Sequence, residues 1–132
     1  MDDARQIIIL VDDNLSSLNQ GKNILKPHYR VYPASSAEKL FETLENVIPD
    51  LILLDIEMPG MSGLEFLHAI RKNPKYMKIP IVVVTGHTEA EIVTRAGRSN
   101  ISGVVYKPIH QEELFKKIEY ALAHPPEGIF GL

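Results

Sequence analysis

Side chains that could carry out chemistry follow four apolar segments of the sequence, each at the point where the segment ends. They are Asp12-Asp13 after Ile7–Val11, Asp55 after Leu51–Leu54, Thr85-Gly86 after Ile81–Val84, and Lys107-Pro108 after Val104–Tyr106. Three carboxylates in one cleft repel one another unless a cation lies between them, and oxygen ligands with partial hydration suit Mg²⁺. The sequence therefore predicts a Mg²⁺ site formed by the aspartates.

A carboxylate can also act as a nucleophile towards a phosphoryl group. Transfer then requires stabilisation of charge on three equatorial oxygens. The metal ion could serve one oxygen, the Lys107 ammonium a second, and the Thr85 hydroxyl with the Gly86 backbone N–H the third. The set predicts that Asp55 is a phosphoacceptor.

Each of these residues also has a plainer interpretation. Asp13 or Asn14 could cap a helix, Thr85 could form a local turn, and Lys107 could be a solvated surface charge. The occurrence of such residues at four strand ends in one chain favours the chemical interpretation over four separate coincidences.

Five short segments rich in β-formers alternate with segments of helical period, which is typical of a parallel sheet covered on both faces. The predicted strands are Ile7–Val11, Tyr29–Ala34, Leu51–Leu54, Ile81–Val84 and Val104–Tyr106. Tyr29–Ala34 contains Arg30 and Pro33, which favours a place at the edge of the sheet. Ligands bind at the carboxyl ends of such strands, where the residues described above lie.

Apolar residues at spacings of three and four predict two amphipathic helices. Their apolar faces are Ala37, Leu40, Phe41, Leu44 and Val47 in one, and Leu114, Phe115, Ile118, Ala121 and Leu122 in the other. Start signals of the capping-box kind occur at Ser35…Glu38, Ser62…Glu65 and Thr88…Glu91. A helix with a weaker apolar face is expected near Glu89–Arg98.

Length and composition indicate one domain of 132 residues. Residues 1–124 are expected to form it, and residues 125–132 a tail or the start of a linker, because paired prolines cannot continue a helix. The net charge of −3 and the lack of a basic run argue against direct nucleic-acid binding. The longest apolar runs are too short for a membrane helix, so a cytoplasmic protein is expected.

The chain resembles the receiver domains of two-component response regulators from Gln6 to about His124. The shared motifs are VDDN (11–14), DIEMPGMSGLE (55–65), VVVTGH (82–87) and YKP (106–108). The resemblance implies a single flavodoxin-like, doubly wound α/β domain with strand order 2-1-3-4-5 and about five helices on both faces.

The resemblance also implies a function and a site. Asp55 would accept a phosphoryl group from a phosphohistidine of a sensor histidine kinase or histidine phosphotransfer protein, with small acyl phosphates as substitutes. Asp13, Asp55 and the backbone carbonyl of Glu57 would bind Mg²⁺ directly, and Asp12 through water. Thr85 and Lys107 would contact the phosphoryl group, and Lys107-Pro108 would be a cis peptide.

Signalling would pass through the surface of the fourth helix, fifth strand and fifth helix to a downstream effector, which the sequence does not identify. The resemblance also allows a homodimer. The chain would catalyse only its own phosphorylation and dephosphorylation. It departs from the family at Val104, where Tyr or Phe is usual, and at Ile109, where Phe is common. We hypothesise that Tyr106, on the same strand face, partly replaces the missing ring. Glu57 and His87 flank the site, two residues after Asp55 and Thr85, and at such positions plain exposed residues are the more common case. The alternative hypothesis is that they control access of the hydrolytic water.

Three other functions could use a similar fold or similar residues. A phosphatase of the haloacid dehalogenase type would carry its nucleophile in a DxD motif after the first strand, whereas Asp55 follows the third. A flavin-binding domain would need a first loop that holds a phosphate, which Asp12 and Asp13 would repel. A receiver fold acting as an unphosphorylated scaffold conflicts with the intact acid, Thr and Lys set, although Val104 keeps that alternative open.

Overall fold

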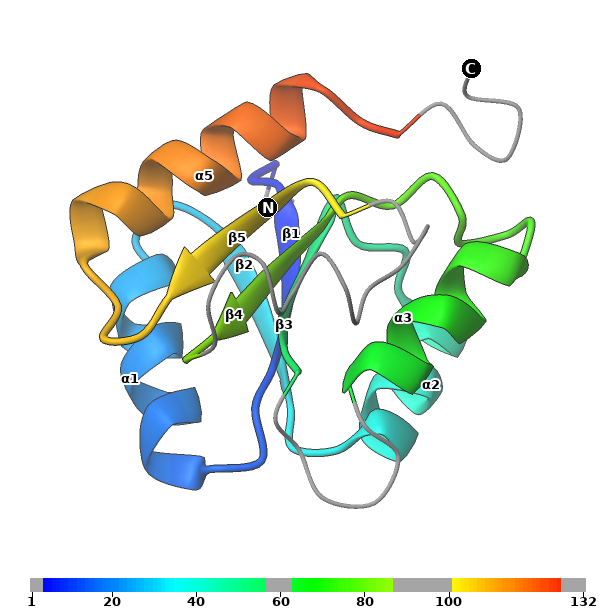
Figure 1. Ribbon diagram of the computed structural model, residues 1–132, viewed down its shortest axis with the longest axis horizontal. Coiled ribbons are helices and arrows are strands. Elements are labelled where there is room, and N and C mark those ends of the chain that lie inside the picture. The colour runs from blue at the N-terminus through cyan, green and yellow to red at the C-terminus, as the bar shows by residue number, and fades with distance from the viewer. Residues whose placement is uncertain (1–3, 57–62, 87–100, 127–132) are drawn as a thin grey trace.

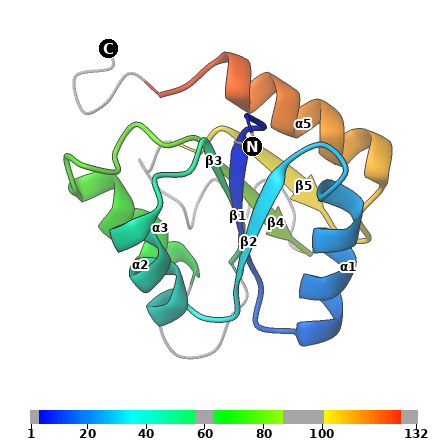
Figure 2. The same cartoon turned by 180° about the vertical axis from the view of Figure 1, so that it is seen from behind.

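The computed structural model describes residues 4–56, 63–86 and 101–126 of the chain. In this part of the chain, five parallel strands form one sheet between helices (Figure 1, Figure 2). The strands are β1 (Ile7–Val11), β2 (Arg30–Ala34), β3 (Leu51–Asp55), β4 (Ile81–Thr85) and β5 (Gly103–Tyr106), in the order β2-β1-β3-β4-β5. The predicted fold class and strand order are confirmed.

The central strands are buried on both faces. Every residue of β3 and β4 is buried, and this explains why their sequences are continuous apolar runs without polar alternation. Both strands extend one residue further than predicted, so that Asp55 and Thr85 are their last residues. β2 pairs with β1 and lies at the edge of the sheet, as Arg30 and Pro33 predicted.

Helices cover both faces of the sheet. Helices α1 (Leu15–Leu25) and α5 (Gln111–Ala123) lie on one face, and α2 (Ala37–Asn46) and α3 (Gly63–Lys72) on the other (Figure 1). Of the roughly five helices expected, these four lie in the described residues, and the helix expected near Glu89–Arg98 lies outside them. None of these four has the length and apolar character needed to cross a bilayer.

The core consists of two apolar clusters, one on each face of the sheet. Alternate residues of a strand enter opposite clusters: Leu53 packs on the α1/α5 side and Leu54 on the α2/α3 side. On the α2/α3 side, the fully buried ring of Phe66 lies 4.5 Å from the ring of Phe41. Both amphipathic faces that the sequence predicted pack against the sheet.

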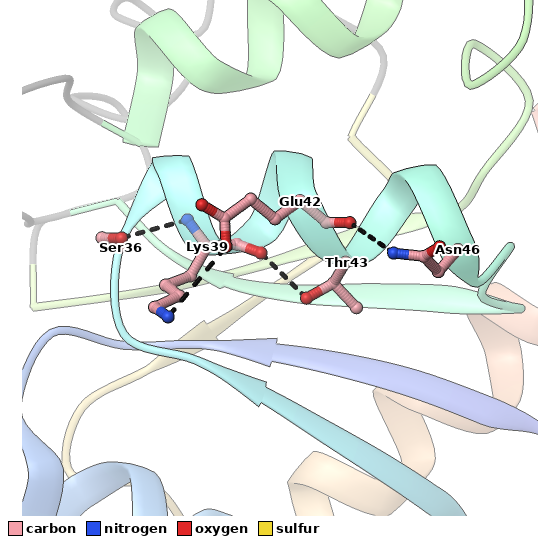
Figure 3. Close-up of polar contacts among 5 residues, drawn as sticks. All are labelled: Ser36, Lys39, Glu42, Thr43 and Asn46. Atoms are coloured by element: carbon pink, nitrogen blue, oxygen red, sulfur yellow. Dashed lines mark hydrogen bonds and ion pairs between the residues drawn. The ribbon is translucent and has the colours of Figure 1, made fainter.

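The start of α2 differs by one residue from the predicted signal Ser35…Glu38. The N-cap is Ser36, whose Oγ accepts a hydrogen bond from the Lys39 backbone N–H at 3.1 Å (Figure 3). The third helical residue is therefore Lys39 instead of Glu38, so the reciprocal contact of a capping box does not form. The signals Ser62…Glu65 and Thr88…Glu91 begin outside the described residues.

Candidate functional site

Three aspartates lie together at the carboxyl ends of the parallel strands. In the register of β1 and β3, Val11 lies beside Leu54, so Asp12 and Asp55 both follow a paired position. Carboxylate oxygens of Asp12, Asp13 and Asp55 lie within 4.8 Å of one another. The predicted convergence of the three side chains is confirmed.

The acidic cluster formed by these three residues is partly withdrawn from water. Asp55 is 3% exposed, Asp12 is half-buried, and Asp13 is exposed. Burial raises the pKa of the Asp12 carboxyl, and the nearby Asp55 carboxylate adds to the rise, whereas a hydrogen bond from Asn14 opposes it. Carboxylates held this close favour a divalent cation among them, and an all-oxygen ligand set fits Mg²⁺.

Lys107 neutralises part of this charge. Its Nζ lies 3.0 Å from Asp55 Oδ2, with 39% of the lysine side chain and 4% of the aspartate side chain exposed. The Lys107 backbone N–H donates to the Thr85 carbonyl at 2.8 Å, which fixes the chain at the end of β5. Lys107-Pro108 is a cis peptide, as expected. Lys107 is thus exposed to solvent, and its ammonium group is also paired with the buried Asp55 carboxylate.

Asn14 connects the acidic cluster to the start of α1. Its side-chain oxygen accepts from the Ser17 backbone N–H at 2.9 Å and caps the helix. Its own backbone N–H donates to Asp12 Oδ1 at 3.0 Å. The capping interpretation thus holds for Asn14, while the Asp13 carboxylate lies in the cluster. The sequence analysis did not predict the contact between Asp12 and Asn14. An Asp two residues before a helix cap could have indicated it, because an Asp side chain often accepts from the backbone N–H two residues later.

Thr85 is fully buried at the end of β4, with exposed Gly86 after it. Its register partner on β5 is Tyr106, so the two residues share a face of the sheet. Val104, two residues earlier in β5, packs against the core cluster on the α2/α3 side. The predicted site residues Glu57 and His87 lie outside the described part of the chain, and their roles stay predictions.

The sequence matches the family model of the response regulator receiver domain over residues 8–119. A cyclic di-GMP phosphodiesterase of Thermotoga maritima is 33% identical over 117 residues, which are 88% of this chain and 30% of that protein. The chain thus spans less than a third of this relative's length.

Solved structures resemble the fold as a whole. Chemotaxis protein CheY4 of Vibrio cholerae matches with a TM-score of 0.84 and 27% identity, covering 89% of this chain and 99% of that one. The receiver domain of sensor histidine kinase PA1611 from Pseudomonas aeruginosa has a TM-score of 0.82 at 22% identity, covering 91% and 99%, and its structure holds a magnesium ion in the active-site cleft.

Fold and site together define a doubly wound α/β domain with an acidic cluster and a paired lysine at the carboxyl ends of its strands. With the family match over most of its length, the chain belongs to the response regulator receiver domain family of two-component signalling.

Proposed function

We propose that Asp55 accepts a phosphoryl group from a phosphohistidine of a sensor histidine kinase or histidine phosphotransfer protein. The observation that carries the proposal is the position of its carboxylate. It is buried, it lies within 4.8 Å of the Asp12 and Asp13 carboxylates, and its Oδ2 lies 3.0 Å from Lys107 Nζ. The site thus combines a nucleophile with a lysine charge and a set of metal ligands.

Each residue has a distinct task in this reaction. A carboxylate oxygen of Asp55 forms a bond to phosphorus while the phosphorus–nitrogen bond breaks, and the electron pair returns to the imidazole. Lys107 neutralises charge on a phosphoryl oxygen, and the Thr85 hydroxyl with the Gly86 backbone N–H contacts another. Asp12, Asp13 and Asp55, with the backbone carbonyl of Glu57, would hold Mg²⁺, which when bound stabilises negative charge on the transferred group.

The output would pass through β5, α5 and the segment between β4 and β5. Thr85 and Tyr106 are register partners, and Lys107 continues β5 towards the start of α5. A change of contacts at Thr85 or Lys107 on phosphorylation would therefore reach this surface directly. The downstream effector that binds there is not specified by these features.

The test is phosphorylation of the whole chain by acetyl phosphate in the presence of Mg²⁺. We expect one phosphoryl group per chain, carried as an acid-stable adduct that hydroxylamine removes, because this is the chemistry of an acyl phosphate. Removal of Mg²⁺ with a chelator should prevent the reaction. The measurement is intact mass before and after hydroxylamine treatment.

Asp55→Asn should abolish the adduct. The matched control is Asp50→Asn, the same substitution at an exposed residue just before the other end of β3. It should phosphorylate normally, since its amide oxygen can still accept the hydrogen bond that Asp50 Oδ2 takes from the Ile7 backbone N–H. An adduct that persists in Asp55→Asn would overturn the proposal by showing that another residue accepts the phosphoryl group. No adduct on the unaltered chain would overturn it in favour of the unphosphorylated scaffold.

A further inference from the structure

A cavity of about 300 Å³ lies beside the acidic cluster, on the α1/α5 side of the sheet. Its apolar lining includes residues that are buried and residues that are partly or fully exposed. The buried ones are Leu10, Val11, Leu53, Val84 and Leu114, and the others are half-buried Ile24 and exposed Pro108 and Ile109. The volume is at the lower end of the range for pockets that bind small molecules.

Gly21 lets α1 pack closely against β1 beside the cavity. It lies in the interior of α1 and lines the cavity. A Cβ atom at this position would lie 2.9 Å from Leu10 Cδ2, so a side chain would have to displace Leu10. Glycine inside a helix costs about 1 kcal/mol relative to alanine. At this position it allows α1 to approach β1 closely without filling the space beside it.

The polar lining determines which molecules fit. Asp12, Asp55 and Lys107 lie where the cavity meets the acidic cluster, and exposed Ser17 and Gln20 of α1 lie at its opening. The carboxylates outnumber the lysine, so an anionic ligand would be repelled. The apolar lining favours a ring system, and Ser17 and Gln20 can each donate and accept a hydrogen bond.

We infer that this cavity binds a small uncharged molecule with an apolar, ring-sized body and one hydrogen-bonding group. The inference does not depend on phosphorylation of Asp55, because it rests on the shape and lining of the cavity. Because Lys107 Nζ contacts Asp55 and the lysine side chain also lines the cavity, the ligand would lie in direct contact with the groups of the acidic cluster.

The test uses indole as an uncharged probe and indole-3-acetate as an anion with the same ring body. Each is titrated into the whole chain without Mg²⁺, and binding is followed by the NMR shifts of the backbone amides of Gly21, Ile24 and Lys107. We expect saturable shifts with indole and binding about tenfold or more weaker with indole-3-acetate. No saturable shift with indole, or equal affinity for the two probes, would overturn the inference.

Two variants test the location. Gln20→Trp places a large ring at the opening, and Gly21→Val fills the space from α1. Each should weaken indole binding about tenfold or more. The matched control Asn19→Trp lies at an exposed position of α1 outside the cavity lining and should bind indole within about twofold of the unaltered chain. Circular dichroism checks that Gly21→Val folds; if it does not, Gln20→Trp alone decides, and unchanged binding by that variant counts against the cavity.

Discussion

Several neighbouring groups act on the pKa of the Asp12 carboxyl, some raising it and some lowering it. Burial, Asp55 and Asp13 raise its pKa above the ordinary value of 3.8, while the Asn14 backbone N–H and Lys107 lower it, and the rise prevails. The folded chain therefore binds a proton at Asp12 more tightly than the unfolded chain. Asp12 therefore contributes to the stability of the folded chain at pH values below its pKa in the unfolded chain. This contribution is lost as the pH rises through its higher pKa in the folded chain.

Because the pKa of Asp12 is raised in the folded chain, removal of its charge by Asp12→Asn should change the stability. At neutral pH without Mg²⁺, we expect the variant to have a higher free energy of unfolding than the unaltered chain, because a repelled charge is gone while the amide oxygen still accepts from the Asn14 N–H. The gain should shrink at about pH 4, where Asp12 in the unaltered chain is protonated to a greater extent. Urea denaturation at the two pH values measures both effects.

Asp12→Ala is the matched control for this comparison. It removes the charge and also the acceptor of the 3.0 Å hydrogen bond from Asn14, so its gain in stability should be smaller than that of Asp12→Asn. Added Mg²⁺ should stabilise the unaltered chain more than either variant. A lower stability of Asp12→Asn at neutral pH without Mg²⁺ would show that repulsion in the acidic cluster is not the dominant effect.

At the scale of helices and strands, the start of α2 shows how one hydrogen bond fixes a boundary. Ser35 and Ser36 are adjacent, and both are half-buried. Ser36 caps the helix through the Lys39 backbone N–H, and the Thr43 hydroxyl donates to the Lys39 carbonyl at 2.8 Å within the same helix (Figure 3). The choice between two neighbouring serines depends on backbone angles, which residue types alone do not determine.

Substitution of the two serines separates their roles. Ser36→Ala should lower the free energy of unfolding by about 1 kcal/mol, because an orphan N–H of the first helical turn loses its acceptor. Ser35→Ala is the matched control one residue away and should change it by less than about 0.5 kcal/mol. Thermal or urea denaturation of both variants makes the comparison. A larger loss for Ser35→Ala would place the cap where the capping-box pattern had put it.

The strands and the site were predictable to different degrees. The apolar segments predicted each strand boundary to within one residue. Because parallel strands end at the same side of a sheet, the pattern was also enough to bring Asp12, Asp55 and Lys107 together. The contact of Lys107 with Asp55 and that of Asn14 with Asp12 depend on rotamers and turn geometry. The cavity at Gly21 depends on how closely α1 packs on Leu10, a distance that the hydrophobic pattern does not contain.

For the molecule as a whole, the question is how a change at Asp55 reaches a binding surface. Receivers usually carry an aromatic residue where this chain has Val104, and here Val104 packs against the core. Tyr106 lies on the same face of β5, is half-buried, and is the register partner of Thr85. A ring at this position is thus in place to respond to a changed contact at Thr85.

We expect Tyr106→Ala to weaken the transmission of the signal without preventing the chemistry. Addition of Mg²⁺ and beryllofluoride, which mimics the phosphorylated state, should shift the backbone amides of α5 less in Tyr106→Ala than in the unaltered chain. Tyr106→Phe, which keeps the ring, is the conservative control and should respond normally. Shifts of equal size in Tyr106→Ala would show that the signal bypasses this ring.

The direction of the strands also affects how this fold can be joined to other proteins. β1 begins at Ile7, and Asp12 of the acidic cluster follows its other end. Figure 1 shows the last turn of α5, which ends at Ala123, on the same side of the domain as the start of β1. A domain linked before β1 or after α5 would attach on that side of the domain and leave Asp55 open to a phosphodonor. The same architecture can therefore be joined to another domain at either terminus without a change in the strand ends that carry Asp12, Asp13 and Asp55.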